Sequence, residues 1–272
     1  MKNTLQNLHT HTVFCDGRNT PEEVVLAAIE KGFGGVGFSA HSFISCAPHL
    51  TMPIEKTGEY KREITRLKQK YKGIIDVYLG LEFDVYSDVG LDGYEYLIAS
   101  LHNLKIDGEL VPFDRSAEVV AQVIDTRFGG DGMAFAKEYY RQLARLPEYG
   151  RFDVIGHFDT ITKNIEKVRF FDTDSKEYVG CALEALDSMR GKIPFFEVNT
   201  GAMARGYRTT PYPAANLLKA FREMGFGAVI TSDCHNAEFL DCGFDLAREL
   251  LIEAGFRERY ILTDAGFAAV SI

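Results

Sequence analysis

The sequence of 272 residues has no tryptophan and only five cysteines, and no Cys-x-x-Cys pair occurs among them. Tryptophan's absence excludes nothing about function, but the cysteine pattern does exclude a disulfide framework and a sulfur-rich structural zinc site. No stretch has the order of a basic, an apolar and a small-residue segment that marks a secretory signal. We therefore predict a cytoplasmic protein in a reducing compartment. The cysteines are Cys15, Cys46, Cys181, Cys234 and Cys242.

Positively charged residues are fewer than negatively charged ones, with 30 Lys and Arg against 39 Asp and Glu and a net charge of −9. An acidic surface repels phosphate polyanions and anionic lipids, so the composition argues against nucleic acid and membrane partners. The apolar runs are all shorter than the ~18 residues of a membrane span. A small anion could still bind, but only at a concentrated positive site. The sequence does not indicate an oligomeric state.

Repeats, low-complexity segments and Pro/Ser-rich linkers are likewise missing, so we predict a single domain over residues 1–272. Apolar runs of strand length alternate with segments of helical period, a pattern typical of an α/β fold with a parallel sheet, and the length suits an α/β barrel. The predicted strands are Leu5–His9, Gly35–His41, Ile74–Asp84, Tyr96–His102, Asp153–His157, Pro194–Asn199 and Ala228–His235.

The first predicted helix has a clear start, where Thr20, Pro21 and Glu23 form a capping box with proline at the first helical position. It runs to Ile29 and ends at Gly32. Residues 103–132 are predicted to be irregular, and they are either a flap over an active site or a surface connection without a role. The further predicted helices are Glu55–Tyr71, Ala134–Arg145, Ser175–Met189, Ala214–Met224 and Leu240–Ala254.

Six of the seven histidines lie at or just past the ends of predicted strands, and only His49 lies elsewhere. A single histidine is usually a hydrogen-bonded structural residue, but the carboxyl ends of parallel strands converge on one face, so these six are expected to meet. His9 and His11 form an H-x-H pair whose side chains point the same way along an extended segment. The six histidines are His9, His11, His41, His102, His157 and His235.

Three carboxylates accompany them: Asp16 in the loop after the first strand, Glu82 at the end of the third, and Asp233 two residues before His235. Asp16 could instead serve only as a turn residue, but Glu82 follows a run that should be buried, and a buried acid needs a partner. Cys234 should point away from its neighbours into the core. Nitrogen and oxygen ligands without thiolate favour zinc, iron or manganese, and nine are too many for one ion.

These residues resemble, in order and over nearly the whole chain, the motifs of the polymerase and histidinol phosphatase (PHP) family. The matching segments are His9-Thr-His11 with Asp16, PheSerAlaHis41, GlyLeuGlu82, AlaSerLeuHis102, GlyHis157PheAsp and Ser232AspCysHis235. The segment 9–17, GluValAsnThrGly at 197–201, Arg205-Gly206 and ProTyrPro at 211–213 are most similar to the histidinol-phosphatases. The departures, Ala40 and Cys234, remove no ligand.

The resemblance implies a distorted TIM-like (β/α)7 barrel with three divalent metal ions, zinc, iron or manganese. By position, the first would take His9, His11, Glu82 and Asp233, and Glu82 would bridge to a second held by His102 and His157. The third would be held by Asp16, His41 and His235. Three such ions outweigh the three carboxylates, so the site would attract a phosphate although the chain is acidic overall.

The implied activity is hydrolysis of the small phosphate ester L-histidinol phosphate, a reaction of histidine biosynthesis, by a metal-bridging hydroxide. No catalytic residue beyond the metal ligands is assigned, and neither is the proton donor to the leaving alcohol. Arg205 and Lys163 are candidate substrate-binding residues, because they follow predicted strands and would complete the grip on the phosphate. Either could instead be a solvated surface cation.

Three alternatives remain open at this point. The same barrel could hydrolyse another small phosphorylated metabolite, with the choice made by loops around 103–132 and 201–212. It could be a non-catalytic PHP scaffold module, although the intact ligand set counts against this. It could also be a barrel-type metal amidohydrolase, against which the additional Asp16, His41 and His235 set argues.

Overall fold

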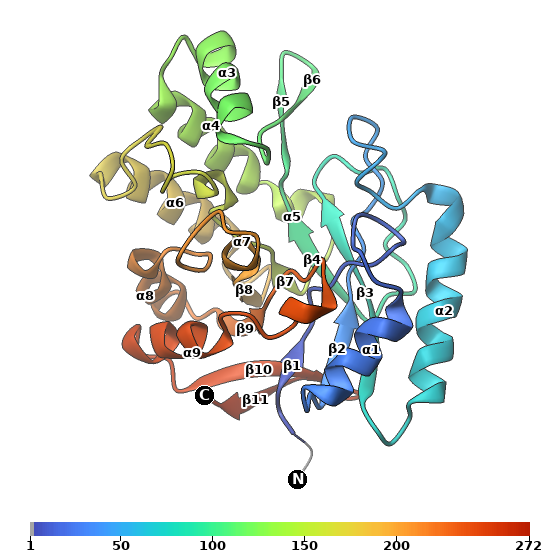
Figure 1. Cartoon of the computed structure of the whole chain (residues 1–272). Helices are drawn as coiled ribbons and strands as arrows, with labels where there is room; N and C mark the ends of the chain where they lie inside the picture. Colours follow the sequence, from blue (N-terminus) through green and yellow to red (C-terminus); the bar gives the residue numbers. More distant parts are fainter. Residues whose placement is uncertain (1–2) are drawn as a thin grey trace.

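A single sheet of seven parallel strands, in the order β1-β2-β3-β4-β7-β8-β9, forms the centre of the computed structural model, which describes residues 3–272 (Figure 1). The predicted barrel of seven parallel strands is therefore confirmed. Five of its strands end two to four residues earlier than predicted, so the histidines lie in the loops just past them, while the strands predicted to end at Asp84 and Asn199 do end there. The strands are β1 (Gln6–Asn7), β2 (Gly35–Phe38), β3 (Asp76–Asp84), β4 (Tyr96–Ser100), β7 (Val154–Ile155), β8 (Phe195–Asn199) and β9 (Gly227–Thr231).

The barrel is nearly closed where its first and last strands leave the sheet. Thr10 and Cys234 form an isolated parallel bridge, in which the His11 amide donates to the Cys234 carbonyl at 2.8 Å and the Cys234 amide donates to the His9 carbonyl at 3.0 Å. Cys234 is 2% exposed, as predicted for a core residue. This bridge sets the two segments that carry H-x-H and Asp-x-His side by side.

Helices surround the sheet, and the predicted cap of the first is confirmed, since Thr20 and Glu23 form both bonds of a capping box. The last predicted helix begins late, at Phe244, because Gly243 before it adopts a left-handed conformation with φ of 71°. The α-helices are α1 (Pro21–Glu30), α2 (Thr57–Lys70), α3 (Ala117–Phe128), α4 (Gly132–Leu143), α5 (Leu146–Tyr149), α6 (Lys176–Met189), α7 (Gly201–Ala204), α8 (Ala215–Glu223) and α9 (Phe244–Glu253). Short 3₁₀ turns occupy η1 (Ile54–Lys56), η2 (Thr160–Thr162) and η3 (Ala237–Phe239).

The prediction that residues 103–132 are irregular is wrong. They contain an antiparallel hairpin, β5 (Asn103–Ile106) with β6 (Glu109–Pro112), followed by α3, and both lie at the top of Figure 1. The two-residue turn Asp107-Gly108 has positive φ at both positions, as hairpin twist requires. The side-chain amide of Gln142 on α4 accepts from the Lys105 amide at 2.9 Å and donates to the Lys105 carbonyl at 3.0 Å, so the hairpin is fastened to a helix.

The amino end of the barrel is covered by a second hairpin that the sequence analysis did not predict, β10 (Glu258–Thr263) with β11 (Gly266–Ser271), at the bottom of Figure 1. The Gln6 side chain pairs with it, donating to the Leu262 carbonyl at 2.9 Å and accepting from the Leu262 amide at 2.7 Å. Leu262 joins a buried cluster with residues of four barrel strands and with Leu8, which follows β1. The cluster is Leu8, Tyr78, Tyr96, Ile98, Val154, Val229 and Leu262.

Two glycines make room for the Tyr96 side chain of this cluster. A Cβ atom at Gly37 or at Gly80 would overlap the Tyr96 side chain, so these strand positions need glycine for the close approach.

Within residues 3–272, no helix is both long and apolar enough to cross a membrane.

Candidate metal centre

All nine residues predicted as metal ligands meet in space at the carboxyl end of the barrel. Three groups each have ligand atoms within 4.8 Å of one another: His9, His11 and Asp233; His41, Glu82 and His102; and His11, Asp16, His41 and His235. His157 adjoins them, with Nε2 at 3.1 Å from His102 Nε2. The convergence follows from the parallel sheet, whose strand ends all face the same side.

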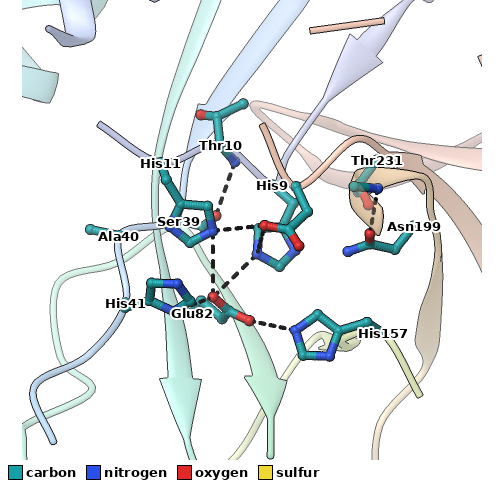
Figure 2. Close-up of polar contacts among 12 residues, drawn as sticks. His9, Thr10, His11, Ser39, Ala40, His41, Glu82, His157, Asn199 and Thr231 are labelled. Carbon is teal, nitrogen blue, oxygen red and sulfur yellow. Dashed lines mark hydrogen bonds and ion pairs between the residues drawn. The ribbon is translucent and has the colours of Figure 1, made fainter. Parts of the chain in front are cut away.

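Glu82 lies at the centre of this cluster and is fully buried (Figure 2). Its Oε2 atom is 2.7 Å from His41 Nδ1 and 3.2 Å from His9 Nε2. Its Oε1 atom is 3.0 Å from His157 Nε2 and 3.4 Å from His102 Nε2. The two carboxylate oxygens therefore face different histidines, as a bridging ligand would.

Asp233 completes the inner part of the cluster. Its Oδ1 atom is 3.1 Å from His11 Nε2 and 3.6 Å from His9 Nε2. The residue has φ of 44°, a left-handed conformation that costs a non-glycine residue energy and that persists where the surroundings impose it. Here the Thr10–Cys234 bridge on one side and Arg205 on the other hold the segment.

Asp16 organises the outer part, which is more open to solvent. Its Oδ1 atom is 3.3 Å from His235 Nε2 and 3.6 Å from His41 Nε2, and the three side chains are 16–21% exposed. The side chains of Glu82, His9 and His11 are, by contrast, 0% exposed. The centre therefore has a dry inner part and a wetter outer part.

The chemistry of the buried atoms fits metal ions. Among residues 3–272, four buried atoms of the cluster form no hydrogen bond of acceptable geometry, although other ligand atoms lie close to them: His9 Nε2, His11 Nε2, Asp16 Oδ1 and Glu82 Oε2. Unsatisfied buried polar groups are rare in proteins, and divalent cations bound between these atoms would satisfy them. Imidazole and carboxylate donors suit borderline divalent ions such as zinc.

A residue that the sequence analysis quoted but gave no role, Glu197 at the end of β8, orients the inner ligands. It is fully buried, and its Oε2 atom lies 2.8 Å from His9 Nδ1. It also accepts hydrogen bonds from the His157 amide, Asn199 Nδ2 and Thr231 Oγ1 at 2.7–2.8 Å. A proton on His9 Nδ1 shared with this carboxylate leaves Nε2 free to face the metal site. The signal in the sequence was an acid inside an apolar strand, PhePheGluValAsn.

Asp84 orients His102 as Glu197 orients His9, and it too was not among the predicted site residues. Its Oδ2 atom lies 3.1 Å from both the amide nitrogen and Nδ1 of His102. It stands two residues beyond Glu82, on the same side of β3, so strand alternation alone could have identified it.

The electrostatics of the centre keep its carboxylates ionised. Burial opposes ionisation of Glu82, but His41, His9 and His102 outweigh it and hold the pKa of Glu82 well below its ordinary value. Burial likewise disfavours charge on His9 and His102, yet nearby carboxylates raise the pKa of each well above 6.5. In the absence of metal, protons compete for the same atoms.

A cavity of about 330 Å³ opens above the histidines, and both predicted substrate-binding residues line it. Neither is a free cation. Arg205 donates from Nη2 to Asp233 Oδ2 at 2.9 Å and from Nη1 to the Asp233 carbonyl at 3.1 Å. Lys163 Nζ lies 2.7 Å from Asp114 Oδ1, a partner that the sequence analysis did not identify.

Other walls of the cavity are apolar or aromatic. One side is formed by Ile44, Ala47 and Leu50, and the other carries Tyr207 and Tyr212. The cavity thus combines a floor of imidazoles and carboxylates, two paired cations and an apolar side. It suits a small ligand with one strongly anionic end.

Comparison with known proteins agrees with this geometry. The model of the PHP domain family matches residues 7–201. A protein of Deinococcus radiodurans named "Probable histidinol-phosphatase" is 31% identical over 239 residues, which cover 84% of this chain and 85% of that protein. The histidinol-phosphatase of Bacillus subtilis is 26% identical, with 84% of this chain and 92% of that protein covered.

Among solved structures, histidinol phosphate phosphatase from Lactococcus lactis, complexed with zinc, L-histidinol and phosphate, superposes with a TM-score of 0.72. The match covers 97% of this chain and 99% of that one at 19% sequence identity, and it shows a shared fold. From the family match and the Deinococcus relative, the chain belongs to the PHP domain family and, within it, to the histidinol-phosphatases.

Proposed function

We propose that the protein is a phosphomonoester hydrolase that converts L-histidinol phosphate to L-histidinol and phosphate in histidine biosynthesis. The observation that carries this proposal is the set of four buried ligand atoms without a hydrogen bond, on His9, His11, Asp16 and Glu82, at the floor of a cavity sized for a small molecule. The named activities of the relatives and the zinc, L-histidinol and phosphate in the Lactococcus structure support the substrate and the cofactor class.

Three divalent ions, zinc, iron or manganese, are proposed for the centre. The inner set would be His9, His11, Glu82 and Asp233, and Glu82 would also serve a second set with His102 and His157. Asp16, His41 and His235 would form the outer set. The observed groups agree with this division in part, because His9, His11 and Asp233 lie together and Asp16, His41 and His235 lie together, while His11 adjoins both sets.

Bound divalent ions supply charge neutralisation for the phosphoryl oxygens and an acidified water at neutral pH. The chain supplies the positioning. Glu197 and Asp84 fix the orientation of His9 and His102. Arg205 is held by Asp233 with 31% of its side chain still exposed, so it can present its guanidinium to a phosphoryl oxygen.

Three further expectations belong to this proposal. We propose that residues 1–272 form one domain, because strands from β1 to β9, all but the β5–β6 hairpin, share one sheet and β10–β11 packs beneath it. The cytoplasmic location stays a prediction from the cysteine pattern. Closure of the segment 103–132 over substrate also stays a prediction.

The test is phosphate release by the purified protein from a panel of L-histidinol phosphate and simple sugar phosphates, with added zinc or manganese and with a chelator. We expect L-histidinol phosphate to be hydrolysed much faster than the others, and chelation to stop the reaction. Equal rates across the panel would reject the substrate. Fewer than two bound ions per chain, by elemental analysis, would favour a scaffold module instead.

A further inference from the structure

The strap between β6 and α3, residues 113–116, is fastened to the loop that follows β7. Lys163 Nζ lies 2.7 Å from Asp114 Oδ1, and Asn164 Nδ2 donates to the Arg115 carbonyl at 2.8 Å. Two adjacent residues of the strap are thus bound to two adjacent residues of the loop. Asp114 and Lys163 are thereby fixed in the wall of the cavity as a pair of opposite charges.

Asp114 differs from the other carboxylates of this cavity. Asp16 and Asp233 belong to the metal centre, and both oxygens of Asp84 accept hydrogen bonds. Asp114 engages Lys163 through Oδ1 alone. Within residues 3–272, no donor reaches its Oδ2 atom, and its side chain is 27% exposed.

This carboxylate is also charged. Burial would raise its pKa, but the Lys163 ammonium beside it holds the pKa of Asp114 below its ordinary range. An ionised carboxylate with an uncommitted oxygen, facing a cavity, is a site for a cationic donor.

The proposed substrate is itself a pair of opposite charges, because an ammonium group stands on the carbon next to the one that bears the phosphate ester. We propose that Asp114 forms an ammonium subsite that selects 2-aminoalkyl phosphate esters, with Lys163 beside it on the phosphate side. This inference rests on the proposed function and adds to it the residue that distinguishes an amino ester from a neutral one.

The experiment measures binding to the zinc-loaded protein by calorimetry with two non-hydrolysable probes, 3-aminopropylphosphonate and propylphosphonate. In both, a methylene group replaces the ester oxygen, so the amine of the first probe is as far from phosphorus as in a 2-aminoalkyl phosphate ester, and the probes differ only in the amine. The dissociation constant should favour the amino probe by about tenfold or more, as expected for a charge-assisted hydrogen bond. Asp114→Asn should bring the ratio of the two constants close to one while binding of propylphosphonate is retained.

Two further variants separate recognition from a merely structural role. Lys163→Met breaks the same ion pair but leaves the carboxylate of Asp114. It should therefore weaken the binding of both probes and preserve the preference for the amino probe. Asp172→Asn, which breaks the exposed pair with Arg169 away from the cavity, should change neither constant. If Asp114→Asn fails to fold, Lys163→Met still tests the proposal. Loss of the amine preference in Lys163→Met would show that the selection depends on the intact ion pair and not on Asp114 itself, and would contradict the proposal.

The inference is overturned if the wild-type protein binds both probes equally, or if Asp114→Asn weakens both by the same factor. These outcomes are distinct from failure of the proposed function. Rapid hydrolysis of L-histidinol phosphate without an Asp114-dependent amine preference would remove only the subsite. A preference for the amino probe without selective hydrolysis of L-histidinol phosphate would remove only the substrate assignment.

Discussion

The two ends of this barrel are built from the same seven strands and are opposite in character. At the carboxyl end the chain leaves regular sheet geometry, Asp233 adopts a left-handed conformation, and buried carboxylates face buried imidazoles. At the amino end the β10–β11 hairpin covers an apolar interior, and the Gln6 amide satisfies both backbone groups of Leu262.

This difference shows how the fold separates chemistry from stability. Buried charges with incomplete partners destabilise a protein unless something else offsets them. Here the stabilising contribution comes from the other end of the same strands, where apolar side chains pack together and the Gln6 side chain satisfies the backbone groups of Leu262. Substitutions at the two ends should therefore have separable effects on activity and on the free energy of unfolding.

The largest expected effect is at the carboxyl end, in Glu82→Gln. The amide keeps the size of the side chain but removes the charge that faces five histidines, so bound metal and activity should be lost together. We expect kcat/KM to fall by about 1,000-fold or more, the scale of several kcal/mol of transition-state stabilisation. Steady-state phosphate release and elemental analysis measure the two losses.

A matched control is Asp153→Asn at the amino end of β7, where the carboxylate accepts from the Leu97 amide at 2.8 Å and contacts no predicted ligand. It should retain metal and activity. Loss of metal from this variant would show that the two ends are not independent.

The second largest effect is expected for a substitution at the amino end of the barrel. Leu262→Ala removes buried methyl groups from the interior cluster and should lower the free energy of unfolding by about 2–4 kcal/mol, measured by urea denaturation. kcat/KM of the folded protein should stay within about twofold of wild type. Ile252→Ala, at a position on α9 that is 57% exposed, serves as the control and should leave the free energy of unfolding unchanged.

A third, smaller effect is expected for Glu197→Gln. An amide group there would turn its NH2 either toward His9 Nδ1 and Thr231 Oγ1 or toward the His157 amide and Asn199 Nδ2, and the first orientation would disturb the tautomer that leaves His9 Nε2 free. Loss of such an orienting partner typically weakens metal binding by about 10–100-fold. Competition with a chelating dye measures the zinc dissociation constant, and an unchanged constant would show that Glu197 has no orienting role.

The carboxyl end was the more predictable from sequence, and the reason is physical. Six histidines followed apolar strands, and a parallel sheet must bring its strand ends to one face, so the nine residues could be grouped before any coordinates existed. The residues behind them were missed because Glu197 and Asp84 act through hydrogen bonds to other side chains. Asp114 was missed because its segment was read as irregular.

The amino-end hairpin escaped prediction although its signal was present. The stretch TyrIleLeuThr at 260–263 and PheAlaAlaVal at 267–270 flank an Asp-Ala-Gly turn, which is a hairpin pattern. The alternation of strand and helix earlier in the chain predicts parallel strands, and a final antiparallel pair does not fit that alternation. Its position beneath the barrel depends on Gln6, some 250 residues away, a contact that no local pattern contains.

The smallest expected effect is a difference in how the two ends respond to pH. Burial disfavours charge on His9 and His102, but their carboxylate neighbours raise both pKa values in the folded protein. Such a contribution is complete below the unfolded pKa of 6.5 and is lost as pH rises toward the folded value, because the folded state then holds more protons than the unfolded one. The metal-free protein should therefore become less stable from about pH 7 to about pH 9.

Zinc should reverse this trend, because metal binding displaces the same protons and its stabilisation grows with pH. Thermal melts across this range, with chelator and with zinc, should thus diverge as pH rises. Glu82→Gln should flatten the curve of the metal-free protein, since it removes a carboxylate that raises both histidine pKa values. Leu262→Ala should lower that curve without changing its slope, because burial raises the pKa of the cluster's two tyrosines above this range and its other members do not titrate. A changed slope in Leu262→Ala would mean that packing at the amino end also sets the geometry of the metal centre, and the separation of the two ends would fail.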